Sequence, residues 1–357
     1  MKEKILSILF VSFLVIFFSL NIITKDIDIS KSERRRLEQL PKLNIKNIFD
    51  NSFMEDFDLY TTDQFVFRDN FRNIKANVNY NILKKIDNNG IYIIDDYIFK
   101  SEHPTNLKSI DNFIDKVNHI NNYLMPNNKV YYSIIPDKNY YVKDKKYLNI
   151  DYDLLYEKVK DINYNYIDLR DILNLNDYYK TDTHWKQEKL CKVVNRLGEY
   201  LNFNTTCDYI KKTYDNFYGV YYGQSALDLK PDRLTYLVND QILNSEAYYL
   251  ENNKNNEAYI EENLNNLDSY DIFLDGSSSY IEISNKYSKN NKELVIFRDS
   301  FASSLTPLLI EFYSKITLID TRYINSDTYL KNIEFNNQDI LFLYSTLIVN
   351  NSFTLKD

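Results

Sequence analysis

Residues 293–320, ELVIFRDSFASSLTPLLIEFYSKITLID, carry the clearest structural signal in the chain. The apolar run at 293–297 predicts a buried strand, residues 301–313 have the apolar spacing of a helix, and 315–320 predict a second strand. A parallel pair of strands needs a long crossover connection, which is usually a helix. Two strands joined by a helix in this way are therefore expected to run parallel. The stretch therefore predicts a βαβ unit.

The same alternation of strands and helices extends along most of the chain. Further strands are expected at 129–135 (KVYYSII, ended by Pro136), 164–169 and 339–344. Apolar residues at helical spacing predict helices over 106–124, over 154–162 and after Trp185, the last marked by Leu190, Val193, Val194, Leu197 and Leu201. This alternation predicts an α/β fold, in which helices cover both faces of a mainly parallel sheet.

The first 25 residues indicate a membrane segment. The run at 5–23, ILSILFVSFLVIFFSLNII, has no charged residue over 19 positions, close to the roughly 20 residues of a spanning helix. No cleavage site of small residues follows, so we expect an uncleaved anchor. Lysines precede the run and three arginines follow at 34–36. The excess of positive charge on one side of the segment, which normally indicates its orientation, is therefore weak. Because long domains translocate largely regardless of charge, we place the N-terminus inside and the rest outside the membrane.

The rest of the chain divides into two parts that differ in sequence pattern. Residues 26–88 are expected to form a juxtamembrane segment with a helix over 62–86, and residues 89–357 an α/β domain that opens with a short hairpin at 91–99. Within that domain, the Tyr-, Asn- and Asp-rich segment 204–292 has no clear periodicity. It predicts an irregular insertion.

The composition excludes several classes of protein. With 44% hydrophobic and 26% charged residues, the chain of 357 residues is expected to fold. Its 43 Lys and Arg against 51 Asp and Glu give a net charge of −8, which argues against a general nucleic-acid binder. Only 5 glycines are present, and no Gly-rich phosphate loop occurs. The sequence has no cluster of Cys and His residues of the kind that binds zinc. We therefore expect neither a metal nor another cofactor. Cys191 and Cys207 are expected to be unpaired, although a disulfide is compatible with an extracytoplasmic domain.

Two short motifs carry groups suited to nucleophilic catalysis. Asp182 and His184 lie two residues apart in TDTHW, and in extended backbone such side chains share a face. The carboxylate can therefore orient the imidazole. Ser300 follows the strand at 293–297 and opens a helix, at the sheet edge where α/β proteins place their sites. Backbone N–H groups at this turn, up to Phe301, would face a developing oxyanion. The motifs predict a nucleophile, a base and an orienting acid.

Each motif also has a purely structural interpretation. Ser300 is suited to cap the helix it opens, and Asp182 to cap the helix after it, with His184 on the first turn. Trp185 is expected to pack rather than to bind substrate. The small, polar run at 275–279 (DGSSS) is expected to be a turn. The motifs alone do not separate the two interpretations.

The order of the motifs resembles that of the DHHW proteins and of the AlgX- and AlgJ-type polysaccharide O-acetyltransferases, a family with an SGNH-hydrolase-like domain. Asp-x-His-Trp at 182–185 is followed far downstream by Asp-Ser-Phe at 299–301. Other similar stretches cover most of the chain after the anchor: SERRRL at 32–37 with Pro41, DQFVFRD at 63–69 preceded by Tyr60, IPDK at 135–138 and IDTRY at 319–323.

The resemblance implies a flavodoxin-like α/β/α sandwich in which Ser300 is the nucleophile, His184 the base and Asp182 its partner. It also implies transfer of an acetyl group to a cell-surface polysaccharide or wall polymer, with a membrane partner that exports the acyl group. The chain departs from the family pattern at two positions. Thr183 replaces the second residue, a histidine, of the Asp-His-His-Trp motif that names the DHHW proteins, and Arg298 stands where many SGNH proteins have glycine.

The oxyanion donors are less defined by the pattern. Besides Phe301, the segments 217–219 and 222–225 are candidates for a loop over the site, so Tyr222, Gly223 and Gln224 are expected to contact the oxyanion or the substrate.

Two other functions fit the same residues. A carbohydrate O-acetyl esterase would use the same triad with water as acceptor, because acceptor choice depends on how well the cleft excludes water. A non-catalytic surface protein would bind glycans or scaffold an assembly through its Tyr-rich insertion. This last function predicts that the side chains of Ser300 and His184 lie out of hydrogen-bond reach.

Overall fold

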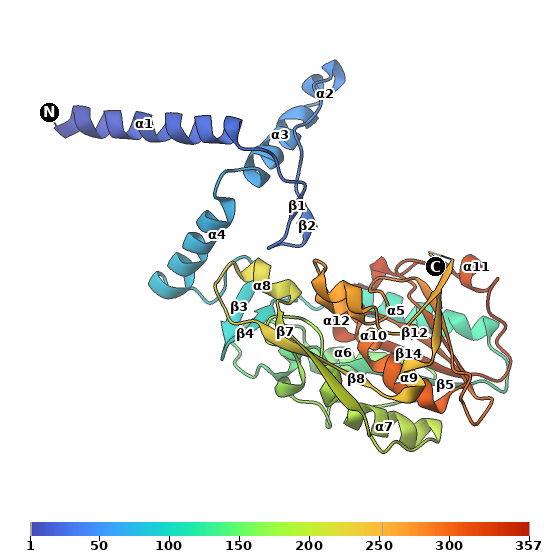
Figure 1. Cartoon of the computed structure of the whole chain (residues 1–357). Helices are drawn as coiled ribbons and strands as arrows, with labels where there is room; N and C mark the ends of the chain where they lie inside the picture. The colour runs from blue at the N-terminus through green and yellow to red at the C-terminus, as the bar shows by residue number, and fades with distance from the viewer. Residues whose placement is uncertain (1, 252, 357) are drawn as a thin grey trace. The chain divides into compact units, whose positions relative to one another are not determined.

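The computed structural model describes residues 2–251 and 253–356. The chain divides into two compact units, one made of Met1–Asn88 with Tyr222–Leu229, the other of Asn89–Tyr221 with Lys230–Asp357. Figure 1 traces the chain through both units.

An eight-stranded sheet forms the centre of the second unit. Its strands are β5 (Lys129–Ile135), β6 (Asn165–Tyr166), β9 (Glu246–Tyr249), β10 (Lys254–Asn256), β11 (Tyr280–Ser284), β12 (Glu293–Arg298), β13 (Lys315–Ile319) and β14 (Asp339–Ser345). Their order is β10-β9-β11-β13-β12-β14-β5-β6. The five strands from β13 to β6 are parallel, and the three at the other edge are antiparallel.

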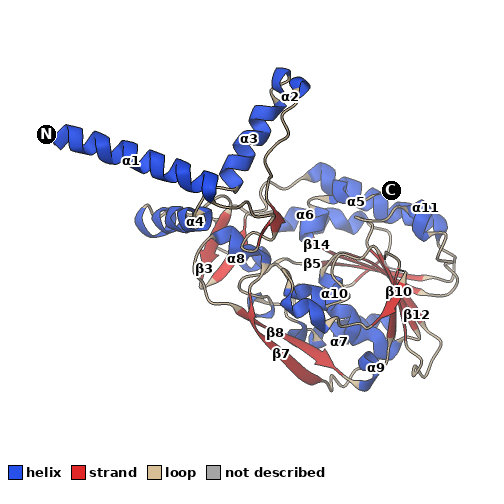
Figure 2. Cartoon of the chain, turned by 45° about the horizontal axis from the view of Figure 1, so that its top comes forward, coloured by secondary structure: helices blue, strands red, loops and turns tan. Residues whose placement is uncertain are grey.

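Helices cover both faces of this sheet, as Figure 2 shows. One layer contains α5 (Leu107–His119) and α6 (Tyr152–Lys158); the other contains α7 (Cys191–Leu201) and α10 (Phe301–Leu305), which a 3₁₀ helix at Thr306–Phe312 continues. Along β12, Leu294 and Ile296 point into one core and Val295 and Phe297 into the other, because successive strand residues face opposite sides. The expected α/β sandwich with a mainly parallel sheet is confirmed.

The segment 204–292, expected to be irregular, contains strands. Antiparallel β7 (Ile210–Phe217) and β8 (Asp232–Val238) form a separate pair, and β9, β10 and β11 extend the main sheet. The sequence signal is weak because β7 (IKKTYDNF) is largely exposed and polar. The unit also includes the predicted hairpin, β3 (Ile91–Ile94) with β4 (Tyr97–Lys100), and the short helices α8 (Val220–Ser225, which continues into the first unit), α9 (Asp240–Leu243), α11 (Ser326–Tyr329) and α12 (Thr346–Val349).

Cys191 and Cys207 form a disulfide, with their Cα atoms 5.9 Å apart. The expectation of two unpaired thiols was wrong. The bond joins the start of α7 to the segment after that helix, where Asn202 takes a left-handed conformation and ends the helix. A sequence separation of 16 residues does not show that the chain turns back at this point. Disulfides persist in oxidising compartments, which agrees with an extracytoplasmic domain.

The first unit begins with α1 (Lys2–Ile23), a helix long and apolar enough to cross a membrane, of which no residue is buried. The unit continues through β1 (Ile29–Ser30), β2 (Arg35–Arg36), α2 (Ile45–Phe49), α3 (Ser52–Asp63), α4 (Arg68–Asn77) and a π-helix, η1 (Val78–Ile82). The helix expected over 62–86 is therefore broken between Asp63 and Arg68, where Phe67 has a positive φ of 59°.

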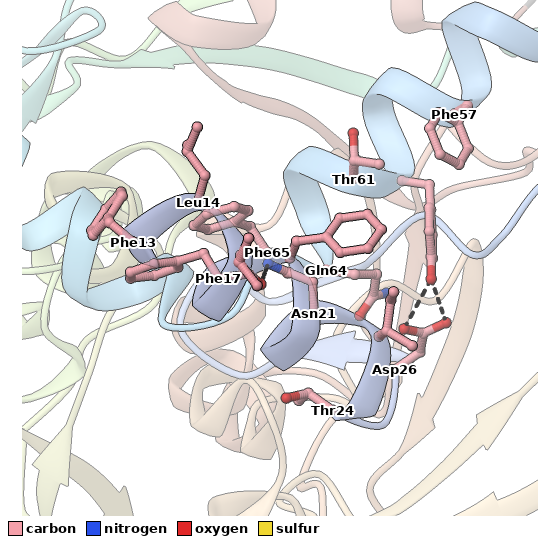
Figure 3. A pocket seen from close by; sticks show the side chains of 14 residues that line it. Phe13, Leu14, Phe17, Asn21, Thr24, Asp26, Phe57, Thr61, Gln64 and Phe65 are labelled. Carbon is pink, nitrogen blue, oxygen red and sulfur yellow. Dashed lines mark hydrogen bonds between the residues drawn. The ribbon is translucent and has the colours of Figure 1, made fainter. Parts of the chain in front are cut away.

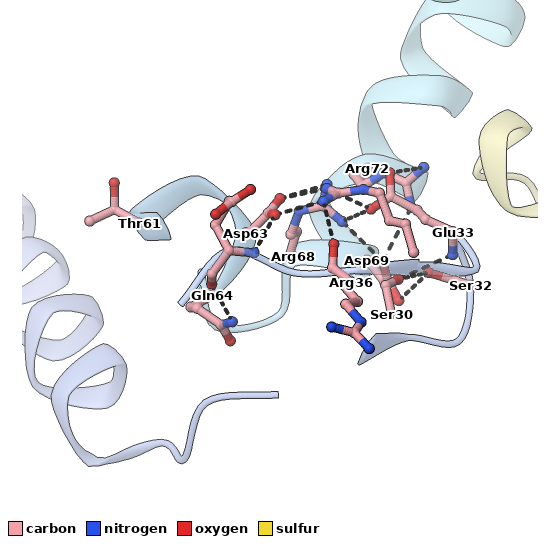
Figure 4. Close-up of polar contacts among 12 residues, drawn as sticks. Ser30, Ser32, Glu33, Arg36, Thr61, Asp63, Gln64, Arg68, Asp69 and Arg72 are labelled. Atoms are coloured by element: carbon pink, nitrogen blue, oxygen red, sulfur yellow. Dashed lines mark hydrogen bonds and ion pairs between the residues drawn. The ribbon is translucent and has the colours of Figure 1, made fainter. Parts of the chain in front are cut away.

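Two of the motifs that resemble the family form one ion-pair network within the first unit (Figure 4). Arg35 donates to both carboxylate oxygens of Asp63 at 2.7 and 2.5 Å, and Arg68 pairs with Glu33 at 2.5 Å. The hydrogen bonds from the Arg35 guanidinium lower the pKa of Asp63 to about 2. SERRRL and DQFVFRD thus occur together because the first supplies charged partners for the second.

Candidate active site

Ser300, His184 and Asp182 form one hydrogen-bonded chain in the second unit. His184 Nε2 lies 2.8 Å from Ser300 Oγ, although the two residues are 116 positions apart. On the other side of the ring, Nδ1 lies 2.6 Å from Asp182 Oδ1, which also accepts a hydrogen bond from the His184 N–H at 2.9 Å. Asp182 is 1% exposed and His184 9%, while Ser300 is only half-buried. The hydroxyl is therefore the member of the chain most open to a substrate.

The helix-capping interpretation does not fit this geometry. Ser300 occupies the N-cap position of α10, but its side chain makes no capping hydrogen bond. The TDTHW stretch is followed by a 3₁₀ helix at Gln187–Lys189, with Lys186 at its N-cap, and by α7, with Leu190 at its N-cap. Asp182 therefore caps neither helix. The non-catalytic function required Ser300 and His184 to lie out of reach, whereas they are within hydrogen-bond distance.

The second oxygen of Asp182 is also engaged. Oδ2 accepts from the Val220 N–H at 2.8 Å. A Cβ at Gly219 would lie 2.3 Å from the Asp182 Cβ, so the loop approaches this closely because residue 219 is glycine. Burial acts to raise the pKa of Asp182, but the His184 ring and the hydrogen bonds from His184 and Val220 outweigh it and hold the pKa below its usual range. Asp182 is therefore a buried carboxylate that stays ionised.

A buried lysine holds the loop that carries Asp182. The Lys138 ammonium donates to the backbone carbonyls of Tyr179, Lys180 and Asp182 at 3.3, 3.2 and 2.6 Å. Burial lowers the pKa of Lys138 to about 7, even though nearby carboxylates such as Asp182 favour its charged form. The resemblance pointed to IPDK at 135–138, and the contacts give its lysine a physical role.

The two backbone N–H groups of the serine turn that are expected to face an oxyanion differ in their hydrogen bonding. The Phe301 N–H, expected to face the oxyanion, donates to Asp299 Oδ1 at 3.0 Å. Asp299 Oδ2 accepts from the Ser345 N–H at 2.7 Å, which ties the turn to the end of β14. Among the hydrogen bonds of residues 2–251 and 253–356, none uses the Ser300 N–H. The Phe301 N–H is thus already engaged, and a role of either group in oxyanion contact stays a prediction.

The candidates Tyr222, Gly223 and Gln224 belong to the first unit. There, Arg72 donates to the Gly223 carbonyl at 2.7 Å, and a Cβ at Gly223 would lie 1.4 Å from the Ser32 carbonyl oxygen. Glycine is thus needed at 223 for close packing within its own unit. A role of these three residues in substrate or oxyanion contact stays a prediction.

Two other residues from the motifs have structural roles. Trp185 is buried, as predicted, and its Nε1–H donates to the Phe301 carbonyl and to Ser304 Oγ, both at 3.0 Å. Arg298 is also buried and donates to Ser303 Oγ at 2.7 Å and to the Ser278 carbonyl at 3.0 Å. Arg298 therefore ties the end of β12 to the 275–279 turn and to α10.

Sequence reasoning missed Tyr270, which stacks on the candidate base. The rings of His184 and Tyr270 are 3.9 Å apart between centroids and inclined by 8°. The Tyr270 hydroxyl donates to Ser304 Oγ at 2.8 Å, so the ring is held at both its face and its edge. An aromatic face attracts a cation, and this contact would favour the imidazolium. Tyr270 is one of 33 tyrosines, and no local pattern distinguishes it.

We expect Tyr270→Leu to reduce kcat about fivefold, because the loss of a cation–π contact of about 1 kcal/mol destabilises the protonated base. Tyr270→Phe keeps the ring and should stay within about threefold of the natural chain. Steady-state hydrolysis of an activated acetyl ester measures both variants. Equal losses in the two would mean that the hydroxyl, and not the stacked ring, supports the site.

No family model matches the chain, and no curated protein matches its sequence. Among solved structures, a DHHW family protein from Eubacterium siraeum superposes with a TM-score of 0.61 at 18% identity, covering 76% of this chain and 98% of that one. The chain has the fold of a DHHW family protein. Bacillus cereus PatB1, in a structure with a sulfonyl adduct, superposes with a TM-score of 0.59 at 17% identity, over 75% of this chain and 100% of that one. The O-acetyltransferase domain of Pseudomonas putida AlgJ is more distant, with a TM-score of 0.38 at 14% identity, over 73% of this chain and 92% of that one.

Proposed function

We propose that the chain is a membrane-anchored, extracytoplasmic O-acyltransferase that moves an acetyl group to a hydroxyl of a cell-surface polysaccharide or wall glycopolymer. One observation carries the proposal: the chain of contacts from Ser300 Oγ to His184 at 2.8 Å and from His184 to Asp182 at 2.6 Å. It has the geometry of a nucleophile, a general base and an orienting acid.

The proposed reaction has two halves. In the first, Ser300 Oγ attacks the carbonyl carbon of the acyl donor while His184 Nε2 takes the hydroxyl proton, and the Ser300 N–H faces the resulting oxyanion. Collapse of this intermediate breaks the bond to the leaving group, which receives the proton from His184, and leaves acetyl-Ser300. In the second half, His184 deprotonates a sugar hydroxyl, which attacks the acetyl ester, and the Ser300 oxygen recovers the proton.

The surroundings of the base suit this cycle. The ionised Asp182 on Nδ1 fixes the ring tautomer and stabilises the imidazolium that each half requires. The Tyr270 face lies against the same ring at 3.9 Å. Val220 and Lys138 in turn hold the Asp182 carboxylate and its loop, so the carboxylate is oriented before substrate binds.

The membrane assignment rests on α1, whose length and apolarity fit either an anchor or a signal segment. We propose the anchor, with the second unit outside the membrane, where a disulfide such as Cys191–Cys207 is stable. We also propose a membrane partner that exports the acyl group, because acetyl donors made inside the cell would otherwise not reach Ser300.

The test uses the purified full chain, a chromogenic acetyl ester and an aryl sulfonyl fluoride, with intact mass as readout. We expect an acetyl adduct, and a sulfonyl adduct like that named for PatB1, both absent in Ser300→Ala. Adding an oligosaccharide should divert acetyl to the sugar; release of free acetate alone would favour the esterase. An adduct that persists in Ser300→Ala would refute the assignment of the nucleophile.

A further inference from the structure

One face of α4 and η1 is apolar and exposed. Phe71, Ile74 and Ile82 are 42%, 57% and 72% exposed and recur at the spacing that places residues on one side of a helix. Ala76, on the other side of α4, is buried, and so is Asn79 in η1. An amphipathic helix normally turns its apolar face inward, so the reversed orientation calls for an apolar environment outside the protein.

Contacts with α1 determine how deep in a bilayer this face would lie. Phe17 stacks with Phe65 at 5.9 Å and also contacts Phe71 at 5.9 Å, while Phe65 and Phe71 meet at 5.8 Å. Phe17 lies six residues before Ile23, the last residue of α1, or about 9 Å inside the helix end at 1.5 Å per residue. If α1 spans the bilayer, the Phe71 ring lies at the level of its outer leaflet.

Polar contacts also join the end of α1 to α3 and to the α3–α4 turn, and Figure 3 shows one of them, from the Tyr60 hydroxyl to the Asp26 carboxylate. Asn21 Oδ1 accepts from the Val66 N–H at 2.9 Å, and the Gln64 side chain bonds both the N–H and the carbonyl of Ile27 at 3.0 Å. Beside this joint, a groove of about 1000 Å³ between α1 and α3 is lined mainly by apolar side chains such as Phe13 and Phe57. α4 therefore keeps a fixed place beside the span instead of moving on a flexible tether.

We propose that the α4–η1 face is a second membrane contact, which lies in the outer interface of the bilayer with Phe71, Ile74 and Ile82 toward the acyl chains. The proposal rests on the anchor assignment above but not on the catalytic one. Its occupant is the lipid bilayer, because the apolar face is continuous with the spanning helix through Phe17. The exposed Lys84 and Lys85 lie just beyond Leu83, the C-cap of η1, and suit anionic headgroups, as in other interfacial helices.

Tryptophan substitutions test this contact in the full chain. The natural chain has one tryptophan, Trp185, buried in the second unit, and it supplies a constant background. We would introduce Ile74→Trp or Ile82→Trp and reconstitute each protein in vesicles of phosphatidylcholine and phosphatidylglycerol, with or without bromine on the acyl chains. The added emission should be blue-shifted and should lose most of its intensity in the brominated vesicles.

The matched control is Phe49→Trp in α2, at the end of α3 remote from α1 in both views (Figures 1 and 2). Phe49 is 86% exposed, and its tryptophan should not be quenched. Unquenched tryptophans at 74 and 82 would overturn the proposal and leave the face for a partner protein. Equal quenching at all three positions would also overturn it, as unspecific immersion. Vesicle flotation separates these outcomes from failure of the anchor, since a chain that does not float has no membrane span, and neither readout depends on activity.

Discussion

Replacing Ser300 with alanine is expected to lower kcat on an activated acetyl ester by about 10⁶-fold, the scale seen when a serine hydrolase loses its nucleophile. The Ser300 hydroxyl is the group that would form the covalent bond to the acyl carbon and give its proton to His184 Nε2, and alanine supplies neither. The half-buried side chain loses one oxygen and makes no helix cap, so stability should be nearly unchanged. Steady-state kinetics and thermal unfolding of the purified full chain measure the two effects.

Ser303→Ala is the matched control for this variant. Ser303 lies one turn later in α10, is buried, and accepts a hydrogen bond from Arg298 at 2.7 Å. Its loss should cost about 1.5–3 kcal/mol of stability, the contribution of a hydrogen bond to a charged group. It should change kcat by less than about tenfold, because the hydrogen bonds that join Asp182, His184 and Ser300 do not involve Ser303. Activity of Ser300→Ala within tenfold of the natural chain would exclude Ser300 as the nucleophile.

The parts that the sequence predicts well are those whose signal is local. The strand at 293–297 and the helix after it show their burial in a run of apolar residues, and β12 and α10 lie where that run predicts. Ser300 could be selected because its place at a strand-to-helix turn is itself a sequence property. Asp182 and His184 could be paired because a separation of two residues fixes their side in extended backbone.

The parts that the sequence does not predict depend on segments that meet only in three dimensions. Tyr270 stacks on His184 across 86 positions of chain, and any buried aromatic side chain has the same local pattern. The sequence also does not show that the Asp299 side chain turns back to accept a hydrogen bond from the Phe301 N–H at 3.0 Å. The Cys191–Cys207 pairing likewise depends on where α7 ends.

Asp182→Asn is expected to lower kcat by about 10⁴-fold while the fold is retained. The amide is nearly isosteric with the carboxylate but carries no charge, and its NH₂ group cannot accept the hydrogen bonds that Oδ1 and Oδ2 now accept. If the NH₂ group faces His184, it holds the ring in the tautomer whose Nε2 carries a proton and cannot act as a base. If it faces Val220 instead, two N–H donors oppose each other, and Oδ1 no longer stabilises an imidazolium through its charge. Steady-state kinetics with thermal unfolding measures the loss.

Asp232→Asn separates this effect from simple loosening of the loop. Asp232 accepts hydrogen bonds from the N–H groups of Lys180 and Thr181 at 3.0 and 2.7 Å and from Thr181 Oγ1 at 2.8 Å. Asp232 thus holds the loop that carries Asp182, and none of these three hydrogen bonds involves the His184 ring. If the charge beside the imidazole is what matters, Asp232→Asn should lose activity by less than about tenfold, the equivalent of 1.4 kcal/mol. Comparable losses in both variants would instead mean that Asp182 acts by positioning the loop. Asp182 would then not be the acid that orients His184.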